Sequence, residues 1–63
     1  MTLEEIKDAI EEGKTVHWSN DGYTVVKDSS GQYLIKYRNG YYIGLTWRDG
    51  LTLKGKESDF YTE

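Results

Sequence analysis

The segment YLIKYRNGYYI, residues 33–43, places two runs of aromatic and aliphatic residues on either side of Asn39-Gly40. Asn and Gly both accept the left-handed backbone conformation that a two-residue type I′ turn requires. The segment therefore predicts a β-hairpin with strands over 33–38 and over 41–46 or 47. A two-residue turn also sets the register, which pairs Arg38 with Tyr41, Tyr37 with Tyr42, Lys36 with Ile43 and Leu34 with Leu45.

Three more glycine-containing pairs interrupt the chain at nearly even spacing: Asp21-Gly22, Ser30-Gly31 and Asp49-Gly50. Such pairs are typical of tight reversals between strands, so we expect further strands over 15–18, 23–27 and 51–53. The loop Ser29-Ser30-Gly31 suits three residues with Gly31 left-handed. That loop pairs Tyr23 with Tyr37 and Val25 with Ile35, and the whole pattern predicts an antiparallel meander of four to five strands.

The first thirteen residues predict a helix over 3–12. Thr2 and Glu5 have the spacing of a capping box, and Gly13 is typical of a helix C-terminus. Leu3, Ile6 and Ile10 fall on one helical face, which would pack on the sheet. The predicted fold class is α+β: an N-terminal helix on a curved antiparallel meander, barrel-like if the curvature is strong, forming one domain over residues 1–63.

Side chains alternate across a strand, so the predicted registers define two faces of the sheet. The first face is the more continuously apolar, and we expect the helix to cover it; it holds Val16, Trp18, Tyr23, Val25, Tyr33, Ile35, Tyr37 and Tyr42. The second face is mixed and holds His17, Thr24, Val26, Leu34, Lys36, Arg38, Tyr41, Ile43, Leu45 and Trp47. Either the 51–53 strand and Phe60-Tyr61 cover its apolar residues, or this face binds a partner or a second copy of the chain.

Composition limits the chemistry. The 63 residues include no cysteine and one histidine, which excludes a disulfide and makes a structural zinc site a poor expectation. Nine aromatic residues are the main supply for the core. No apolar run approaches the roughly 20 residues of a membrane span, and the acidic N-terminus does not resemble a secretory signal. We expect a cytoplasmic protein with no metal or cofactor and no membrane partner.

Charge is unevenly distributed although the net charge is only −3. Residues 1–13 carry −4, residues 14–56 carry +4 and residues 57–63 carry −3. The helix places like charges four residues apart and acids at its C-terminal end, and both arrangements are mildly destabilising. This acidic face predicts a non-enzymatic interaction protein that binds a host protein through Glu4, Asp8, Glu11 and Glu12. The alternative interpretation is an acidic face that serves solubility alone.

The mixed second face supports another hypothesis. Aromatic rings that stack on bases and cations that contact phosphates are typical of single-stranded nucleic-acid binding. The candidate residues for such a site are His17, Lys36, Arg38, Tyr41 and Trp47. The competing interpretation is that these aromatics are core. No nucleophile is placed beside His17 by any motif, so the sequence does not favour an enzyme.

The segments YIGLTWRDG (42–50), TLKGKE (52–57) and DFY (59–61) resemble small uncharacterised proteins of bacteria, phages and prophages. The resemblance extends back through GQYLI (31–35) and covers most of the chain. No activity is known for that group, so no catalytic residue carries over. The resemblance implies an origin in a phage or mobile element and a partner that is a host protein or nucleic acid. Whether the chain is a monomer or a homodimer stays open.

Overall fold

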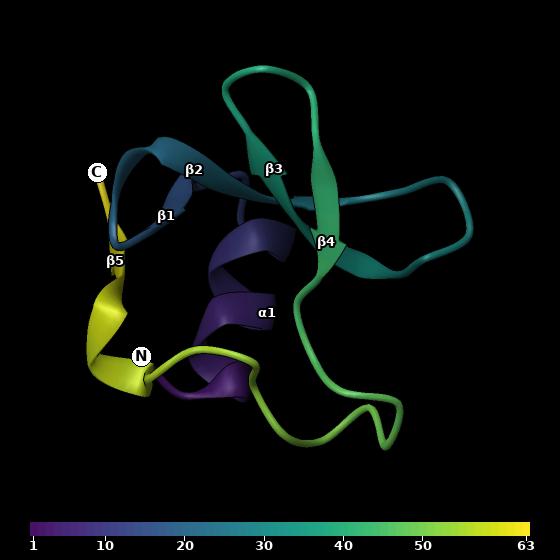
Figure 1. Ribbon diagram of the computed structural model, residues 1–63. Helices are drawn as coiled ribbons and strands as arrows, with labels where there is room; N and C mark the ends of the chain where they lie inside the picture. The colour runs from purple at the N-terminus through teal and green to yellow at the C-terminus, as the bar shows by residue number, and fades with distance from the viewer.

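The computed structural model describes residues 1–63 and begins with the helix α1, Leu3–Glu11 (Figure 1). The capping box is formed: the backbone N–H of Glu5 donates to Thr2 Oγ1 (3.2 Å), and the N–H of Thr2 donates to Glu5 Oε1 (2.8 Å). Beyond the helix, Gly13 is left-handed (φ 82°), and the N–H of Lys14 donates to the carbonyl of Ala9 (2.9 Å). These bonds satisfy the free carbonyls of the last turn. The helix prediction is confirmed, and this nine-residue helix is too short and too polar to cross a membrane.

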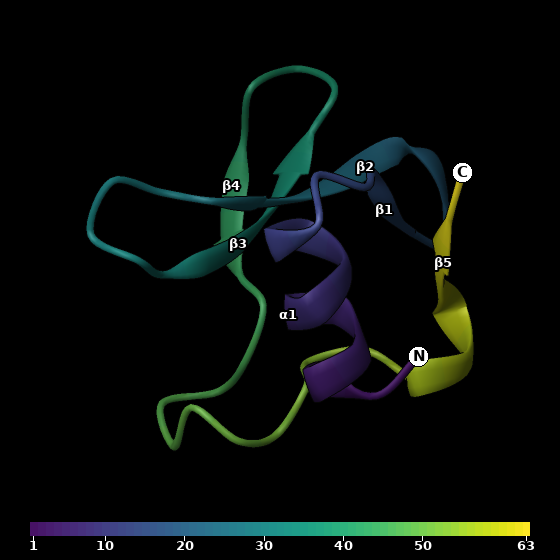
Figure 2. The same ribbon diagram turned by 180° about the vertical axis from the view of Figure 1, so that it is seen from behind.

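Five antiparallel strands form one sheet in the order β4-β3-β2-β1-β5 (Figures 1 and 2). Their bounds are β1 Val16–Trp18, β2 Asn20–Lys27, β3 Tyr33–Tyr37, β4 Tyr42–Gly44 and β5 Phe60–Thr62. The predicted α+β fold with an antiparallel meander is confirmed. The strands β4 and β5 are the two edges and do not pair with each other, so the sheet is open and not a closed barrel.

The helix covers one face of the sheet, as Figure 2 shows. Ile6 and Ala9 of α1 pack with buried residues of the strands and of the segments that follow β4, namely Val16, Val25, Ile35, Leu45 and Phe60. Partly buried aromatic rings surround this cluster. A domain of this size has a thin stability margin, so these few residues carry most of the hydrophobic stabilisation.

The register of the β3–β4 hairpin differs from the prediction by one residue. The structure pairs Ile35 with Ile43 and Lys36 with Tyr42. Gly40 (φ 93°) is the only left-handed residue between the strands, whereas a type I′ turn needs two. The N–H of Tyr37 donates to the carbonyl of Tyr41 (2.7 Å), so the loop has three residues, 38–40, and not two.

The same loop geometry joins β2 to β3. There the N–H of Asp28 donates to the carbonyl of Gln32 (2.9 Å), and Gly31 is left-handed (φ 91°). The predicted three-residue loop is confirmed at this position, as are the pairs of Tyr23 with Tyr37 and of Val25 with Ile35. Both hairpins therefore have a left-handed glycine as the third loop residue.

The one-residue difference reverses the faces of the fourth strand, because side chains alternate along a strand. Ile43 lies opposite Ile35 and packs against the core, and Leu45 is fully buried. Tyr42 turns to the outer face and is half exposed. The predicted excess of apolar residues on the second face is therefore wrong: Ile43 and Leu45 belong to the core.

The fifth strand also lies elsewhere than predicted. Around Leu51–Leu53 the structure has only one bridge, between Leu53 and Thr46. The chain continues past the start of α1, where the amino group of Met1 donates to the carbonyl of Glu57 (2.6 Å), as the yellow-green segment of Figure 1 shows. A short 3-10 helix, Glu57–Asp59, then leads into β5, which pairs with β1 at the opposite edge of the sheet.

We expect Gly40→Ala to lower the free energy of unfolding by about 1 kcal/mol, because a side chain disfavours the left-handed backbone. Gly40→Asn should lose less, since Asn enters that conformation more readily. No atom lies within 4 Å of the position a Cβ would occupy, so the difference reports the backbone alone. Urea denaturation of the three proteins measures it, and equal stabilities would contradict the loop assignment.

Candidate functional site

The acidic face of α1 is only partly free. Glu11 Oε1 accepts from Lys27 Nζ (2.7 Å) and from the hydroxyl of Tyr33 (2.9 Å), and these bonds hold the pKa of Glu11 below its usual value. Glu12 forms an ion pair with Lys14 (3.1 Å). Glu4 and Asp8 form no ion pair and stand exposed. Of the four acids predicted to bind a partner, two are thus engaged by bases of the chain itself.

The five residues predicted to bind nucleic acid are not brought together. Lys36 lies on the outer face with its Nζ 6.0 Å from the centroid of the Tyr42 ring, whereas Tyr41 follows the core face, its ring 6.3 Å from that of Tyr37. Arg38 sits in the β3–β4 loop and pairs with Asp21 (3.3 Å). The physical reason is the three-residue loop, which places Tyr41 and Lys36 on opposite faces.

His17, the fifth residue of that set, is a structural residue. The side chain is buried, at 7% exposure, where it lies across from Tyr61 of β5. Nε2 lies 3.1 Å from Glu63 Oε1, and Nδ1 donates to the carbonyl of Tyr23 (3.0 Å). The pKa of His17 is raised by the Glu63 carboxylate, which has the largest effect, and by the Tyr23 carbonyl. Burial of the ring opposes both effects. The ring therefore links β5 and the bulged part of β2 to β1.

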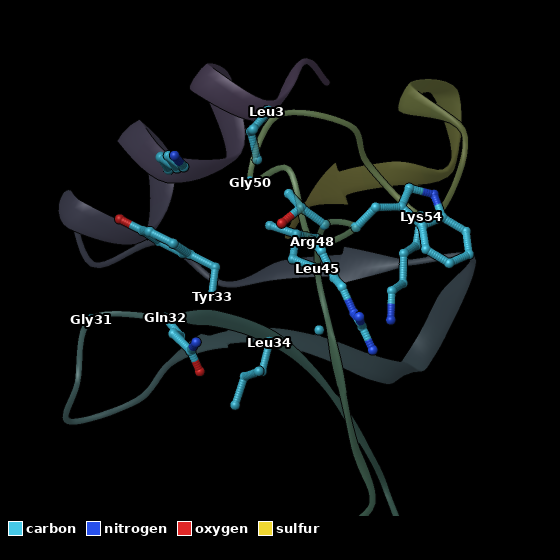
Figure 3. Close-up of a pocket in the computed structure, with 13 residues that line it drawn as sticks. Leu3, Gly31, Gln32, Tyr33, Leu34, Leu45, Arg48, Gly50 and Lys54 are labelled. Atoms are coloured by element: carbon cyan, nitrogen blue, oxygen red, sulfur yellow. The ribbon is translucent and has the colours of Figure 1, made fainter.

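A groove of about 650 Å³ opens between α1, the β3–β4 hairpin and the segment after β4 (Figure 3). We call it the basic groove, because its charged lining residues are Lys7, Arg48 and Lys54 and no carboxylate lines it. Two aromatic residues, Tyr33 and Trp47, also line it. Of the residues predicted from sequence to bind nucleic acid, only Trp47 belongs to this lining.

Aromatic rings hold two of the three cations in place. Lys7 Nζ lies 5.6 Å from the centroid of the Tyr33 ring, and Lys54 Nζ lies 5.2 Å from that of Trp47. Figure 3 shows Arg48 and Lys54 extending in the same direction from the segment that carries them. None of the three forms an ion pair, so the positive charge of the basic groove is not neutralised by the chain.

The acid next to Arg48 in the sequence, Asp49, does not form an ion pair with it. The Asp49 carboxylate accepts from the backbone N–H of Leu51 (2.8 Å), and from the backbone N–H (3.0 Å) and hydroxyl (2.7 Å) of Thr52. These bonds lower the pKa of Asp49, and the bond from the Leu51 backbone has the largest effect. The carboxylate thus closes its own loop, while Arg48 beside it lines the basic groove. Sequence reasoning missed Lys7, Arg48 and Lys54, because it placed a turn at Asp49-Gly50 and a strand over 51–53 and expected no contact between this region and the helix.

No protein-family model matches the chain, and neither a curated protein nor a solved structure matches it. Its function is therefore inferred from these surfaces alone.

We expect the pKa of His17 to lie above its ordinary value of about 6.5 and to fall in Glu63→Gln, as an NMR titration of the single imidazole can measure. A raised folded-state pKa stabilises the fold at low pH. This contribution is fully present below about pH 6.5 and is lost as pH rises through the folded-state pKa. Urea denaturation should show that loss in the wild type and less of it in Glu63→Gln. An unchanged pKa in the variant would contradict the link.

Proposed function

We propose that the chain is a non-enzymatic binding protein that holds an anionic partner in the basic groove. The observation that carries this proposal is that Lys7, Arg48 and Lys54 all line one groove and that none of them forms an ion pair. Cations placed together without counter-charges repel one another, and a bound anion relieves that repulsion.

The net charge of −3 does not prevent such binding, because the effect of distant charges is screened. At physiological ionic strength the screening length is roughly 8 Å, so charges at the groove act more strongly than those elsewhere. The nearby acid Glu11 is held by Lys27 and Tyr33, and Asp49 by its own loop. The attraction is therefore local and should weaken with added salt.

The arrangement favours binding over catalysis. The one histidine lies on β1, donates to the carbonyl of Tyr23 on β2 and faces Glu63, which follows β5. The groove itself offers cations, aromatic rings, an amide and aliphatic side chains. Cationic and aromatic groups of this kind hold and orient anions, whereas general acid–base catalysis needs a group that titrates near the working pH.

We expect Arg48→Gln/Lys54→Gln to weaken the binding of tripolyphosphate at least tenfold at low salt, because two of the three groove cations are lost. Amide chemical shifts in an NMR titration measure the affinity and should place the wild-type response in residues 44–54. Lys36→Gln is the matched control, since Lys36 is also an exposed, unpaired lysine above an aromatic ring. Equal losses in both variants would overturn the proposal.

A second candidate function uses the free edge of α1, Glu4 and Asp8. These acids stand four residues apart and repel each other, and neither forms an ion pair. Two exposed acids without an ion pair favour a basic patch on a host protein as their partner, in keeping with an origin in a phage or mobile element. Electrostatic attraction of this kind speeds association and depends on salt.

For this second function we expect Glu4→Gln/Asp8→Gln to weaken binding of a lysine-rich peptide several-fold in low-salt calorimetry. Stability should change by less than about 0.5 kcal/mol, because removing the repulsion is offset by losing the favourable interaction of Glu4 with the helix N-terminus. Glu12→Gln is the comparison, since Glu12 is already paired with Lys14. If the double variant binds the peptide as the wild type does, the free edge is not a binding site.

A further inference from the structure

We infer that the anionic partner of the basic groove is a single-stranded nucleic acid; this inference rests on the function proposed above. A phosphate chain would satisfy the cations alone, but the groove also presents aromatic rings beside two of them. Alternation of rings and cations suits a ligand that alternates flat bases with phosphates.

Trp47 is the aromatic residue best placed to stack on a base. Its side chain is 57% exposed, although a large apolar ring is normally more buried. The other tryptophan, Trp18, packs against the rings of Tyr23 and Phe60, whereas Trp47 pairs with no other ring. The one interaction at its ring is with Lys54 Nζ at 5.2 Å. A base stacked on Trp47 would therefore place its phosphate within reach of a cation.

Tyr33 supplies a second ring at the other side of the basic groove. Its hydroxyl donates to Glu11, and both Lys7 and Lys27 lie near its ring, at 5.6 and 5.7 Å from the centroid. The ring is thus fixed in orientation with cations around it. Figure 3 shows Tyr33 at one end of the groove and Lys54 at the other. The two ring–cation pairs can therefore contact different nucleotides of one extended strand.

The floor of the groove permits close approach of a strand. Gly44 has no side chain, and a Cβ there would contact the Thr46 carbonyl (3.4 Å) and Lys54 Nζ (3.9 Å). Lys54 itself is exposed, so its amine can meet a ligand beside β4. Gln32 adds an amide that can donate and accept hydrogen bonds at a base edge.

These features discriminate between classes of anion. A duplex offers phosphates but hides the faces of its bases, so Trp47 would have no partner. An acidic peptide offers carboxylates without flat rings, and tripolyphosphate offers charge alone. Only an unpaired strand uses the cations and Trp47 together.

The test is fluorescence anisotropy of a labelled oligothymidine with the full chain at low and moderate salt. We expect Trp47→Leu to weaken binding about tenfold and Trp47→Phe to weaken it less, because Phe keeps a ring. Trp47→Leu should weaken tripolyphosphate binding much less than oligothymidine binding, because all three groove cations keep their charge although Lys54 loses the ring beside it. Added salt should weaken oligothymidine binding to every variant. Trp18 remains in each variant, so its fluorescence verifies the fold.

Other outcomes separate this inference from the function on which it rests. If Arg48→Gln/Lys54→Gln weakens both ligands while Trp47→Leu weakens neither, the groove binds anions but the nucleic-acid inference is wrong. If polyglutamate or a duplex competes as well as oligothymidine, the inference is also wrong. If neither tripolyphosphate nor oligothymidine binds the wild type, both proposals fail.

Discussion

The left-handed glycine that closes each hairpin loop is the constraint on which the sheet depends. Gly31 and Gly40 occupy the same position in two three-residue loops, and each sets the register of the strands around it. A register change of one residue moves every side chain of a strand to the opposite face. Gly40 therefore determines that Ile43 and Leu45 face α1 and that Tyr42 faces outward. Without those two residues the core beneath the helix would lose part of an already small apolar cluster.

The segment between β4 and β5 has two consequences for the molecule. It returns past the start of α1 to add β5 beside β1, where His17 contacts Glu63 and Phe60 enters the core. Its passage also brings Gly55 against the indole of Trp18, so closely that a Cβ would overlap the ring nitrogen. The same segment carries Trp47, Arg48 and Lys54, which line the basic groove. A single connection thus completes the sheet and builds the candidate site.

The charged side chains divide into those engaged within the chain and those left free. Glu11, Glu12, Asp21 and Asp49 are each held by a base or a loop of the chain, whereas Glu4 and Asp8 are not. Surface pairs of this kind stabilise a fold little, so their main effect is on which charges remain available to a partner. The charges that remain free include a short acidic edge on α1 and the cations of the basic groove. The proposed functions correspond to these two surfaces.

Local patterns in the sequence were sufficient to predict the helix and its two ends. They also predicted the loop before β3, the register of β2 with β3 and the α+β class. Each of these features depends on residues that are close in the chain. The register of β4 was not predictable from Asn39-Gly40, since that pair suits both a two-residue and a three-residue loop. The position of β5 was not predictable either, because it depends on contacts between residues more than forty positions apart. The basic groove depends on both: it needs the position of β4 and the return of the chain past α1. The tertiary structure alone therefore determined which cations and rings lie together.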